Sequence, residues 1–243
     1  NALDVVYELN MNLIVANMKD FFQFPMGMMI DIKHSKDSTT PDIPYQTFTH
    51  ALVQGEKTLE RFVPVQHPVA LYQYTGGTTG KSKGAVIKHS SLIAVIKMAQ
   101  DMLQAYSDRF AIQAGDTVLT ALPMYHIFAF NFNFLLFFSQ GGHNILIPNP
   151  RPLDNLEKAF QKFDVNWITG VDTLFAGLLQ QDWFIQNPPR LKLAISGGTA
   201  LRQSTAQAWK NKISTIVEGY GMTESSCFVS VNPPLDHSPI GSV

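Results

Sequence analysis

Cysteine is almost absent from this sequence. Cys227 stands alone, so the chain cannot form an internal disulfide. This fits a reducing, cytoplasmic setting, and Cys227 itself is expected to be a small, buried, apolar side chain.

An excess of charge of one sign is lacking too. The formal net charge is −1 and charged residues make up 15% of the chain, which gives no general drive towards nucleic acid or anionic lipid.

Long hydrophobic runs and a secretory signal are also missing. The most apolar window covers residues 127–138 (IFAFNFNFLLFF). It is about 12 residues long, whereas a membrane-spanning helix needs roughly 20, so we expect a buried helix there. Asn1 and Ala2 resemble the remnant of a cleaved affinity tag. Both ends lack a capping or polar tail, and we therefore expect a piece of a longer protein.

From residue 69 onward, short apolar runs alternate with amphipathic stretches. Strands are expected at residues 69–74, 85–88, 117–122, 144–147, 165–168, 191–195 and 215–218. Helices are expected at residues 91–106, with Ser90 as the cap, and at 127–139, 153–163, 173–181 and 202–212. This alternation predicts an α/β fold in which helices flank a largely parallel sheet on both faces.

The first part of the chain has a different pattern. A strand is expected at residues 12–18 and a short helix at 48–55, separated by the polar, proline-bearing stretch HSKDSTTPDIPY. We therefore treat residues 3–68 and 69–243 as separate regions.

A glycine-rich loop, YTGGTTGKSKG, spans residues 74–84. It contains Gly80-Lys81-Ser82 like a Walker A loop, but that motif needs a glycine five residues before Gly80, where this chain has Thr75. The length of that loop determines how its amides wrap around a phosphate. A P-loop ATPase or kinase is therefore the less favoured alternative.

The loop nevertheless carries phosphate-binding chemistry of its own. Glycines permit positive φ and close backbone approach, while amides, hydroxyls and lysine side chains donate to phosphate oxygens. The candidate binding residues are Thr75, Gly76, Gly77, Thr78, Thr79, Gly80 and Lys83. A solvated glycine turn between two strands is the alternative.

Three further stretches carry candidate residues, each at the end of an expected strand. They are His126 in ALPMYHIFAF; Gly197, Gly198, Thr199 and Ala200 in ISGGTALR; and Tyr220, Gly221, Met222, Thr223 and Glu224 in EGYGMTES. Taken singly, a structural histidine, a packing turn and a solvated glutamate are the alternatives.

Together these motifs resemble the adenylate-forming enzymes: acyl-CoA synthetases, adenylation domains of peptide synthetases, and luciferases. The usual phosphate loop of that family reads YTSGTTGxPKG, and here Gly76 replaces the serine and Ser82 the proline. The Gly76 variant and the stretches LPMYHIFAFNFNFLLF and NPRPLDNLEKAFQKFDVNWITGVDTLF are similar to bacterial long-chain fatty acid–CoA ligases. The resemblance covers residues 69–243, and residues 10–68 more loosely.

The resemblance implies part of a large N-terminal adenylation (AMP-binding) domain, incomplete over residues 3–68 and with its core at 69–243. The ribose-binding aspartate, the hinge and the catalytic lysine of a C-terminal domain are expected beyond Val243, so we expect the isolated chain to be inactive. The implied reaction activates a long-chain fatty acid with ATP and Mg²⁺ to an acyl-adenylate and pyrophosphate, and then transfers the acyl group to CoA as a substrate.

The resemblance also implies roles for the candidates. His126 is expected to face the acyl carboxylate, and the glycine-rich loop to hold the β- and γ-phosphates. Thr223 is expected to donate to the α-phosphate, Glu224 to hold Mg²⁺ and Tyr220 to stack on adenine, next to the glycine turn at 197–200. His126, Thr223 and Glu224 are thus the catalytic candidates.

Several alternatives stay open at this point. Residues 168–179 resemble a segment lining the acyl tunnel, with core packing by Gly170, Val171 and Gly177 as an equal reading. An adenylation domain for another carboxylic or amino acid, and a non-catalytic relative, are further alternatives. The resemblance also allows peripheral association with the inner face of the membrane and a homodimer; chain-length preference is not determined by the sequence.

Overall fold

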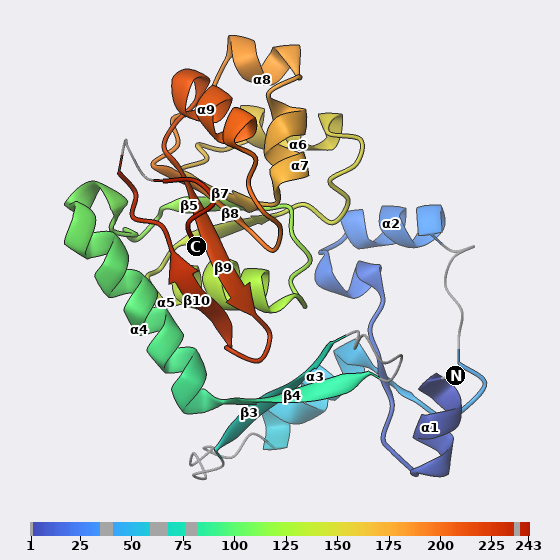
Figure 1. Cartoon of the computed structure of the whole chain (residues 1–243). Helices are drawn as coiled ribbons and strands as arrows, with labels where there is room; N and C mark the ends of the chain where they lie inside the picture. The colour runs from blue at the N-terminus through green and yellow to red at the C-terminus, as the bar shows by residue number, and fades with distance from the viewer. Residues whose placement is uncertain (1, 35–40, 59–67, 76–81, 236–238) are drawn as a thin grey trace. The chain divides into compact units, whose positions relative to one another are not determined.

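The computed structural model describes residues 2–34, 41–58, 68–75, 82–235 and 239–243. The chain forms two compact units, Asn1–Val65 and Gln66–Val243 (Figure 1).

The N-terminal unit consists of short elements. In chain order they are α1 (Ala2–Glu8), β1 (Ile14–Val15), the 3-10 helix η1 (Met18–Phe21), α2 (Met26–His34), β2 (Gln46–Thr47) and α3 (Phe48–Thr58). β1 and β2 pair in parallel, and the rings of Phe21 and Phe48 lie 5.2 Å apart. The helix expected at 48–55 is confirmed, the strand expected at 12–18 shrinks to two residues, and α2 was not predicted.

A six-stranded sheet organises the second unit. Its strands are β5 (Thr117–Thr120), β6 (His143–Leu146), β7 (Trp167–Gly170), β8 (Leu193–Gly197), β9 (Ile216–Met222) and β10 (Cys227–Val231). They lie in the order β10-β9-β8-β7-β5-β6, and every pair is parallel except β9 with β10. The predicted, largely parallel sheet is confirmed, although β10 was not anticipated.

Helices cover both faces of this sheet (Figure 1). They are α4 (His89–Tyr106), the 3-10 helix η2 (Asp108–Phe110), the π-helix η3 (Ala129–Leu136), α5 (Phe137–Ser139), α6 (Asp154–Lys162), α7 (Asp172–Leu178), α8 (Asp182–Gln186) and α9 (Gln203–Lys212). One apolar core lies beneath α4 and η3, and a second beneath α6, α7 and α9.

Alternate residues of the buried strands enter the two cores, as the strand period of two requires. Val118 and Trp167 join the core beneath α4 and η3, while their chain neighbours Leu119 and Ile168 join the opposite one. This double burial explains why these strands read as almost continuous apolar runs in the sequence.

The expectation that Ser90 caps α4 is wrong. The helix begins at His89, its N-cap position is Lys88, and this cap residue makes no side-chain cap hydrogen bond. The backbone amide of His89 instead donates to the carbonyl of Pro68 at 3.0 Å. The start of α4 is therefore fixed by its attachment to the neighbouring hairpin.

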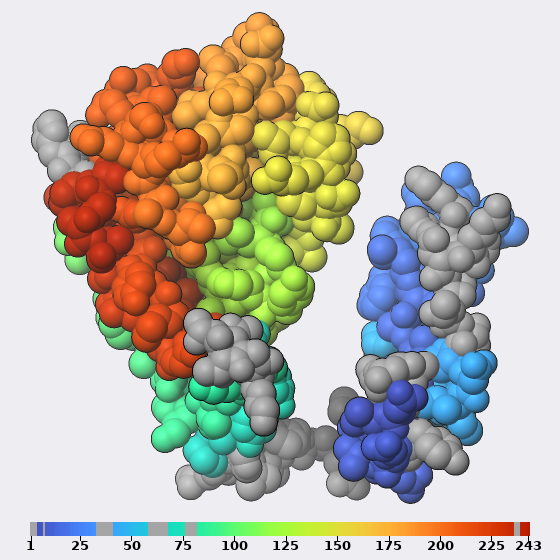
Figure 2. Space-filling view, turned by 45° about the vertical axis from the view of Figure 1, so that its right-hand side comes forward, coloured from blue at the N-terminus to red at the C-terminus, as the bar shows by residue number. Residues whose placement is uncertain are grey.

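That hairpin consists of β3 (Val69–Thr75) and β4 (Lys83–Lys88), which pair antiparallel with Thr75 opposite Lys83. In the space-filling view its teal surface adjoins the orange-red surface of the C-terminal strands (Figure 2).

Across the described residues, the helices are all too short or too polar to cross a bilayer.

Candidate functional site

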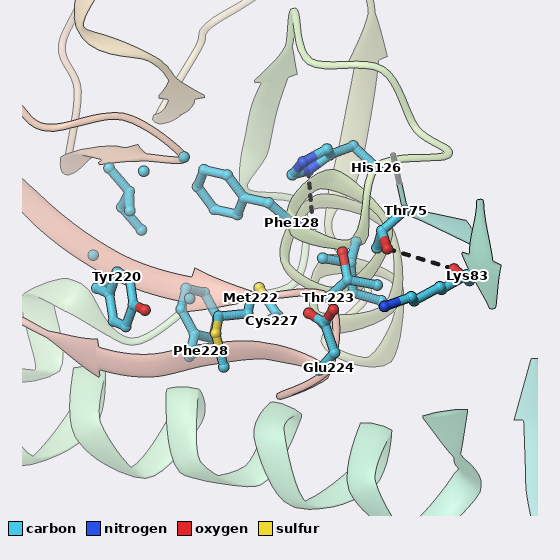
Figure 3. Close-up of a pocket in the computed structure, with 16 residues that line it drawn as sticks. Thr75, Lys83, His126, Phe128, Tyr220, Met222, Thr223, Glu224, Cys227 and Phe228 are labelled. Carbon is cyan, nitrogen blue, oxygen red and sulfur yellow. Dashed lines mark hydrogen bonds between the residues drawn. The ribbon is translucent and has the colours of Figure 1, made fainter. Parts of the chain in front are cut away.

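A cavity of about 510 Å³ opens at the carboxyl ends of β8 and β9, the edge at which open parallel sheets bind ligands. Its walls come from the ends of the β3–β4 hairpin, from the segment after β5, from the glycine turn after β8, and from the β9–β10 hairpin (Figure 3). The sequence-predicted residues among them are Thr75, Lys83, His126, Gly197, Gly198, Tyr220, Gly221, Met222, Thr223 and Glu224. Segments up to about 150 residues apart in the chain thus share one cavity.

The hairpin brings both ends of the glycine-rich loop to the cavity. Thr75 Oγ1 donates to the carbonyl oxygen of Lys83 at 3.4 Å, and Ser82 Oγ donates to the carbonyl oxygen of Thr75 at 3.3 Å. The hydroxyl of Ser82 therefore closes the base of the loop. The proline that is usual in the family has no side-chain donor and could not make this hydrogen bond. The candidates Gly76, Gly77, Thr78, Thr79 and Gly80 lie outside the described residues.

The Lys83 side chain points towards Thr223 and Glu224 (Figure 3). The hairpin itself is attached to the segment that carries His126, because Gln73 Nε2 donates to the carbonyl oxygen of Tyr125 at 3.0 Å. The geometry therefore gathers one ammonium, one hydroxyl and one carboxylate on the same side of the cavity.

His126 begins the helical segment that leads into η3, since its carbonyl accepts the amide of Phe130 at 2.9 Å. The ring nitrogen Nδ1 accepts the backbone amide of Phe128 at 3.3 Å. In the neutral imidazole the proton must then lie on Nε2. His126 thus offers the cavity an N–H donor suited to an anionic oxygen.

The second signature occupies a hairpin and not the end of a strand. β9 continues four residues beyond the expected end at Glu218, to Met222, and pairs with β10. The hydroxyl of Ser225 accepts the amide of Met222 at 3.1 Å and closes the turn. The extension places Thr223 and Glu224 at a tight turn on the cavity's edge.

Gly221 is the glycine that this hairpin most clearly requires. A Cβ at that position would lie 1.6 Å from the carbonyl oxygen of Cys227. Cys227 itself is buried, as predicted, and burial raises the pKa of its thiol. Tyr220 is 48% exposed, so its side chain is accessible to a ligand.

The glycine turn after β8 borders a second cavity, of about 360 Å³, which adjoins the first. Gly198 adopts φ +79°, the left-handed region that favours glycine. Thr199 and Ala200 line this second cavity together with Gly198, and Tyr220 belongs to the walls of both. A flat aromatic base between Tyr220 and this turn would have access to either space.

Two buried carboxylates that the sequence did not single out hold this turn. Glu218 Oε1 accepts the amide of Leu201 at 2.8 Å, and Asp172 Oδ1 accepts the amide of Arg202 at 3.1 Å. Glu218 is 3% exposed and Asp172 6%. Sequence reasoning missed both because their partners lie 17 and 30 residues away.

The pKa of Asp172 lies below its ordinary value. Burial alone would raise it, but the hydrogen bond from the backbone of Arg202, that from the Thr205 side chain, and the guanidinium of Arg202 together outweigh burial. Asp172 is therefore a charged anchor for the start of α9.

The donor set at the cavity fits a cation that arrives with a phosphate. Within the described residues, histidine, cysteine and carboxylate side chains do not form a group of three or more that would hold a metal by itself. Glu224 contributes a single carboxylate next to the hydroxyl of Thr223. Mg²⁺ typically binds through one or two carboxylates plus substrate phosphate oxygens, and Glu224 suits that mode.

Comparison with known proteins agrees with the geometry. The anthranilate CoA ligase AuaEII, in complex with anthranoyl-AMP, superposes with a TM-score of 0.72 at 19% identity over 95% of this chain and 45% of its own. The chain therefore shares the fold of the corresponding part of that ligase.

The sequence comparisons are more specific. The profile of the AMP-binding enzyme family matches residues 26–243, and the chain belongs to this family. A long-chain-fatty-acid–CoA ligase of Escherichia coli O157:H7 is 42% identical over 91% of this chain and 40% of its own length. One from Haemophilus influenzae is 39% identical over 94% and 42%. The chain thus spans about two-fifths of the length of these relatives.

Proposed function

We propose that the protein carrying this chain is a long-chain fatty acid–CoA ligase. In the first step a carboxylate oxygen of the fatty acid bonds to the α-phosphorus of ATP, and the bond to the bridging oxygen breaks to release pyrophosphate. In the second step the sulfur of CoA, its thiol proton lost to solvent, bonds to the acyl carbon and AMP leaves. The observation that carries the proposal is the convergence of Lys83, His126 and the Tyr220–Glu224 hairpin on one cavity.

The first step brings two anions together, so the site must offset negative charge and hold the reacting atoms in line. In this proposal Lys83 and the loop after Thr75 bind the β- and γ-phosphates, while the hydroxyl of Thr223 donates to an α-phosphate oxygen. Tyr220 stacks on adenine beside the glycine turn. Each of these groups acts by positioning, and none forms a covalent bond with the substrate.

His126 is assigned to the acyl carboxylate. Because Nδ1 is occupied by the Phe128 amide, the Nε2–H of the neutral ring is the group left to donate to the carboxylate oxygen that does not attack. This orients the nucleophile and reduces its repulsion from the α-phosphate. Glu224 would hold Mg²⁺, which when bound would supply positive charge that stabilises the transferring group.

An apolar groove next to the cavity supports a fatty acyl substrate. It measures about 190 Å³, and its walls include Met98 and Met102 of α4, Phe132 of η3 and Val231 of β10. Ile195 and Phe228 line both the groove and the polar cavity. A hydrocarbon chain entering there gains about 0.8 kcal/mol per buried methylene.

For residues 168–179, lining of an acyl tunnel and core packing were equal readings, and Val171, Leu174 and Gly177 do border a cavity of about 230 Å³. A Cβ on Gly170 would lie 2.6 Å from Leu174 Cδ2, and one on Gly177 would lie 2.7 Å from Leu153 Cδ1. The space beside Gly170 is therefore occupied by side chains of α7, which favours core packing there, whereas Gly177 packs against Leu153 and also borders the cavity. We place the acyl chain in the groove beneath α4 instead.

The test is ATP–pyrophosphate exchange by the full-length protein carrying this chain, across fatty acids of several lengths, short carboxylic acids and amino acids. The proposal predicts exchange that depends on a long-chain fatty acid. Release of γ-phosphate without exchange would indicate a P-loop ATPase or kinase, and exchange with amino acids alone would indicate a different adenylating enzyme. Lys83→Met should reduce exchange about 10-fold or more, whereas Lys88→Met, at the other end of β4, should not.

The proposal also includes a cytoplasmic location, with peripheral attachment to the inner membrane face and a homodimer as predictions of the resemblance. Sedimentation of the purified protein alone tests the homodimer, and sedimentation with anionic vesicles tests the peripheral attachment.

A further inference from the structure

A buried side-chain amide joins the two segments that carry the catalytic candidates. Asn131 belongs to η3, the helix that His126 leads into, and is 1% exposed. Its Nδ2 donates to the carbonyl oxygen of Ser226 at 2.7 Å. Ser226 follows Thr223 and Glu224 in the turn of the β9–β10 hairpin, so this hydrogen bond spans 95 residues of sequence.

The contact has a fixed direction. The carbonyl of Ser226 is an acceptor only, so the amide group of Asn131 must present its nitrogen to it. Both ends of the hydrogen bond are buried, since Asn131 is 1% exposed and Ser226 is 4% exposed. A hydrogen bond that is shielded from water in this way is costly to leave unmade.

The turn needs an external partner because its own backbone is strained. Ser226 and Cys227 adopt φ +61° and +124°, conformations that L-residues with side chains rarely take and that persist when the surroundings enforce them. Within the turn, the amide of Ser226 donates to the carbonyl of Thr223 at 3.0 Å. The same residue is therefore held from both sides, by Thr223 and by Asn131.

We propose that Asn131 is a positioning residue for the adenylation step, which sets the place of Thr223 and Glu224 relative to His126. The assignment rests on the proposed function for its catalytic meaning. Asn131 touches neither substrate nor cation in this account. It acts by fixing the strained turn to the helix that follows His126. The Thr223 hydroxyl and the Glu224 carboxylate thereby keep their places relative to the Nε2–H of His126, which donates to the acyl carboxylate.

The chain offers a matched control two residues away. Asn133 is also on η3 and 0% exposed, but its Nδ2 donates to Thr120 Oγ1 and Thr169 Oγ1, both at 2.8 Å. These partners lie in β5 and β7, within the sheet. Asn133 therefore resembles Asn131 in burial and residue type, yet its hydrogen bonds among the described residues run to the sheet and not to the β9–β10 turn.

Hydrogen–deuterium exchange of the full-length protein measures positioning without reference to activity. Asn131→Leu should speed deuterium exchange of a peptide covering residues 222–228 by about 10-fold or more. In this variant the turn can open locally without first breaking the hydrogen bond to Ser226. Asn133→Leu should change this peptide by less than about twofold. Equal acceleration in both variants, or none in Asn131→Leu, would overturn the proposal.

Kinetics supply the second readout. In pyrophosphate exchange, Asn131→Leu should lower kcat about 10- to 100-fold while KM for the fatty acid changes little, because misplacement of catalytic groups affects the transition state most. Asn133→Leu, assayed below its unfolding temperature, should keep kcat.

Asn131→Ala repeats the test with less steric change. If both Asn131 variants fail to fold while Asn133→Leu folds, Asn131 serves stability and the proposal is refuted. If the wild-type protein shows no exchange with any acid, the proposed function fails, while deuterium exchange still decides whether Asn131 holds the turn.

Discussion

Replacing Gly221 by alanine should disrupt the β9–β10 hairpin. The added Cβ would lie 1.6 Å from the carbonyl oxygen and 2.7 Å from the carbonyl carbon of Cys227. Both are backbone atoms, so relief requires the two strands to separate by at least about 1.4 Å, since real Cβ atoms keep a distance of 3.0 Å or more. We expect a loss of about 3 kcal/mol or more in the free energy of unfolding.

The assay is urea unfolding followed by tryptophan fluorescence, which reports on the fully buried Trp167 and Trp209. Gly219→Ala is the matched control on the same strand, because its Cβ would meet nothing closer than 3.5 Å, the side chain of Val231. It should change stability by less than about 1 kcal/mol. A Gly221→Ala protein as stable as the Gly219→Ala protein would refute the reasoning.

Three further predictions concern other parts of the site and core. Asp116→Ala removes the carboxylate that Lys192 Nζ contacts at 2.8 Å and should cost about 2–3 kcal/mol in urea unfolding; a loss below about 0.5 kcal/mol would contradict this. The folded-state pKa of Asp172 is lowered, so its contribution is present above the unfolded pKa of about 3.9 and is lost as pH falls through the folded value. The stability difference between wild type and Asp172→Asn should therefore close in acid, and a difference that widens there would reverse the assigned sign. Tyr220→Ala should weaken ATP binding about 2- to 10-fold by calorimetry, whereas Tyr125→Ala, at a residue 79% exposed, should not.

Local patterns were enough to predict most of the α/β unit. The buried strands read as apolar runs because both their faces are covered, and α6 shows its apolar side through Leu156 and Phe160. Strand β10 escaped prediction because CFVSV is short and follows the polar turn TESS. Its pairing with β9 also carries β9 on to Met222, an extension that comes from a tertiary contact and leaves no local signal.

In the site, too, features with a local sequence signal were predicted, and features that depend on tertiary contacts were not. Its candidate residues were found because glycine, hydroxyl and charged side chains cluster at strand ends in recognisable motifs. Glu218, Asp172 and Asn131 were missed because their hydrogen-bond partners lie 17 to 95 residues away in the sequence. The window at 127–138 was expected to be an ordinary helix, but residues 129–136 form a π-helix with two buried asparagines whose partners lie in other elements.

The central claim is that the hairpin end at Lys83 and the turn at Thr223 serve one nucleotide. A crystal structure of the full-length protein with α,β-methylene-ATP and Mg²⁺ tests it most directly. The account predicts Lys83 Nζ and Thr223 Oγ1 within hydrogen-bonding distance of the same triphosphate, with Tyr220 against the adenine. A triphosphate that contacts one of these residues and leaves the other facing solvent would contradict it.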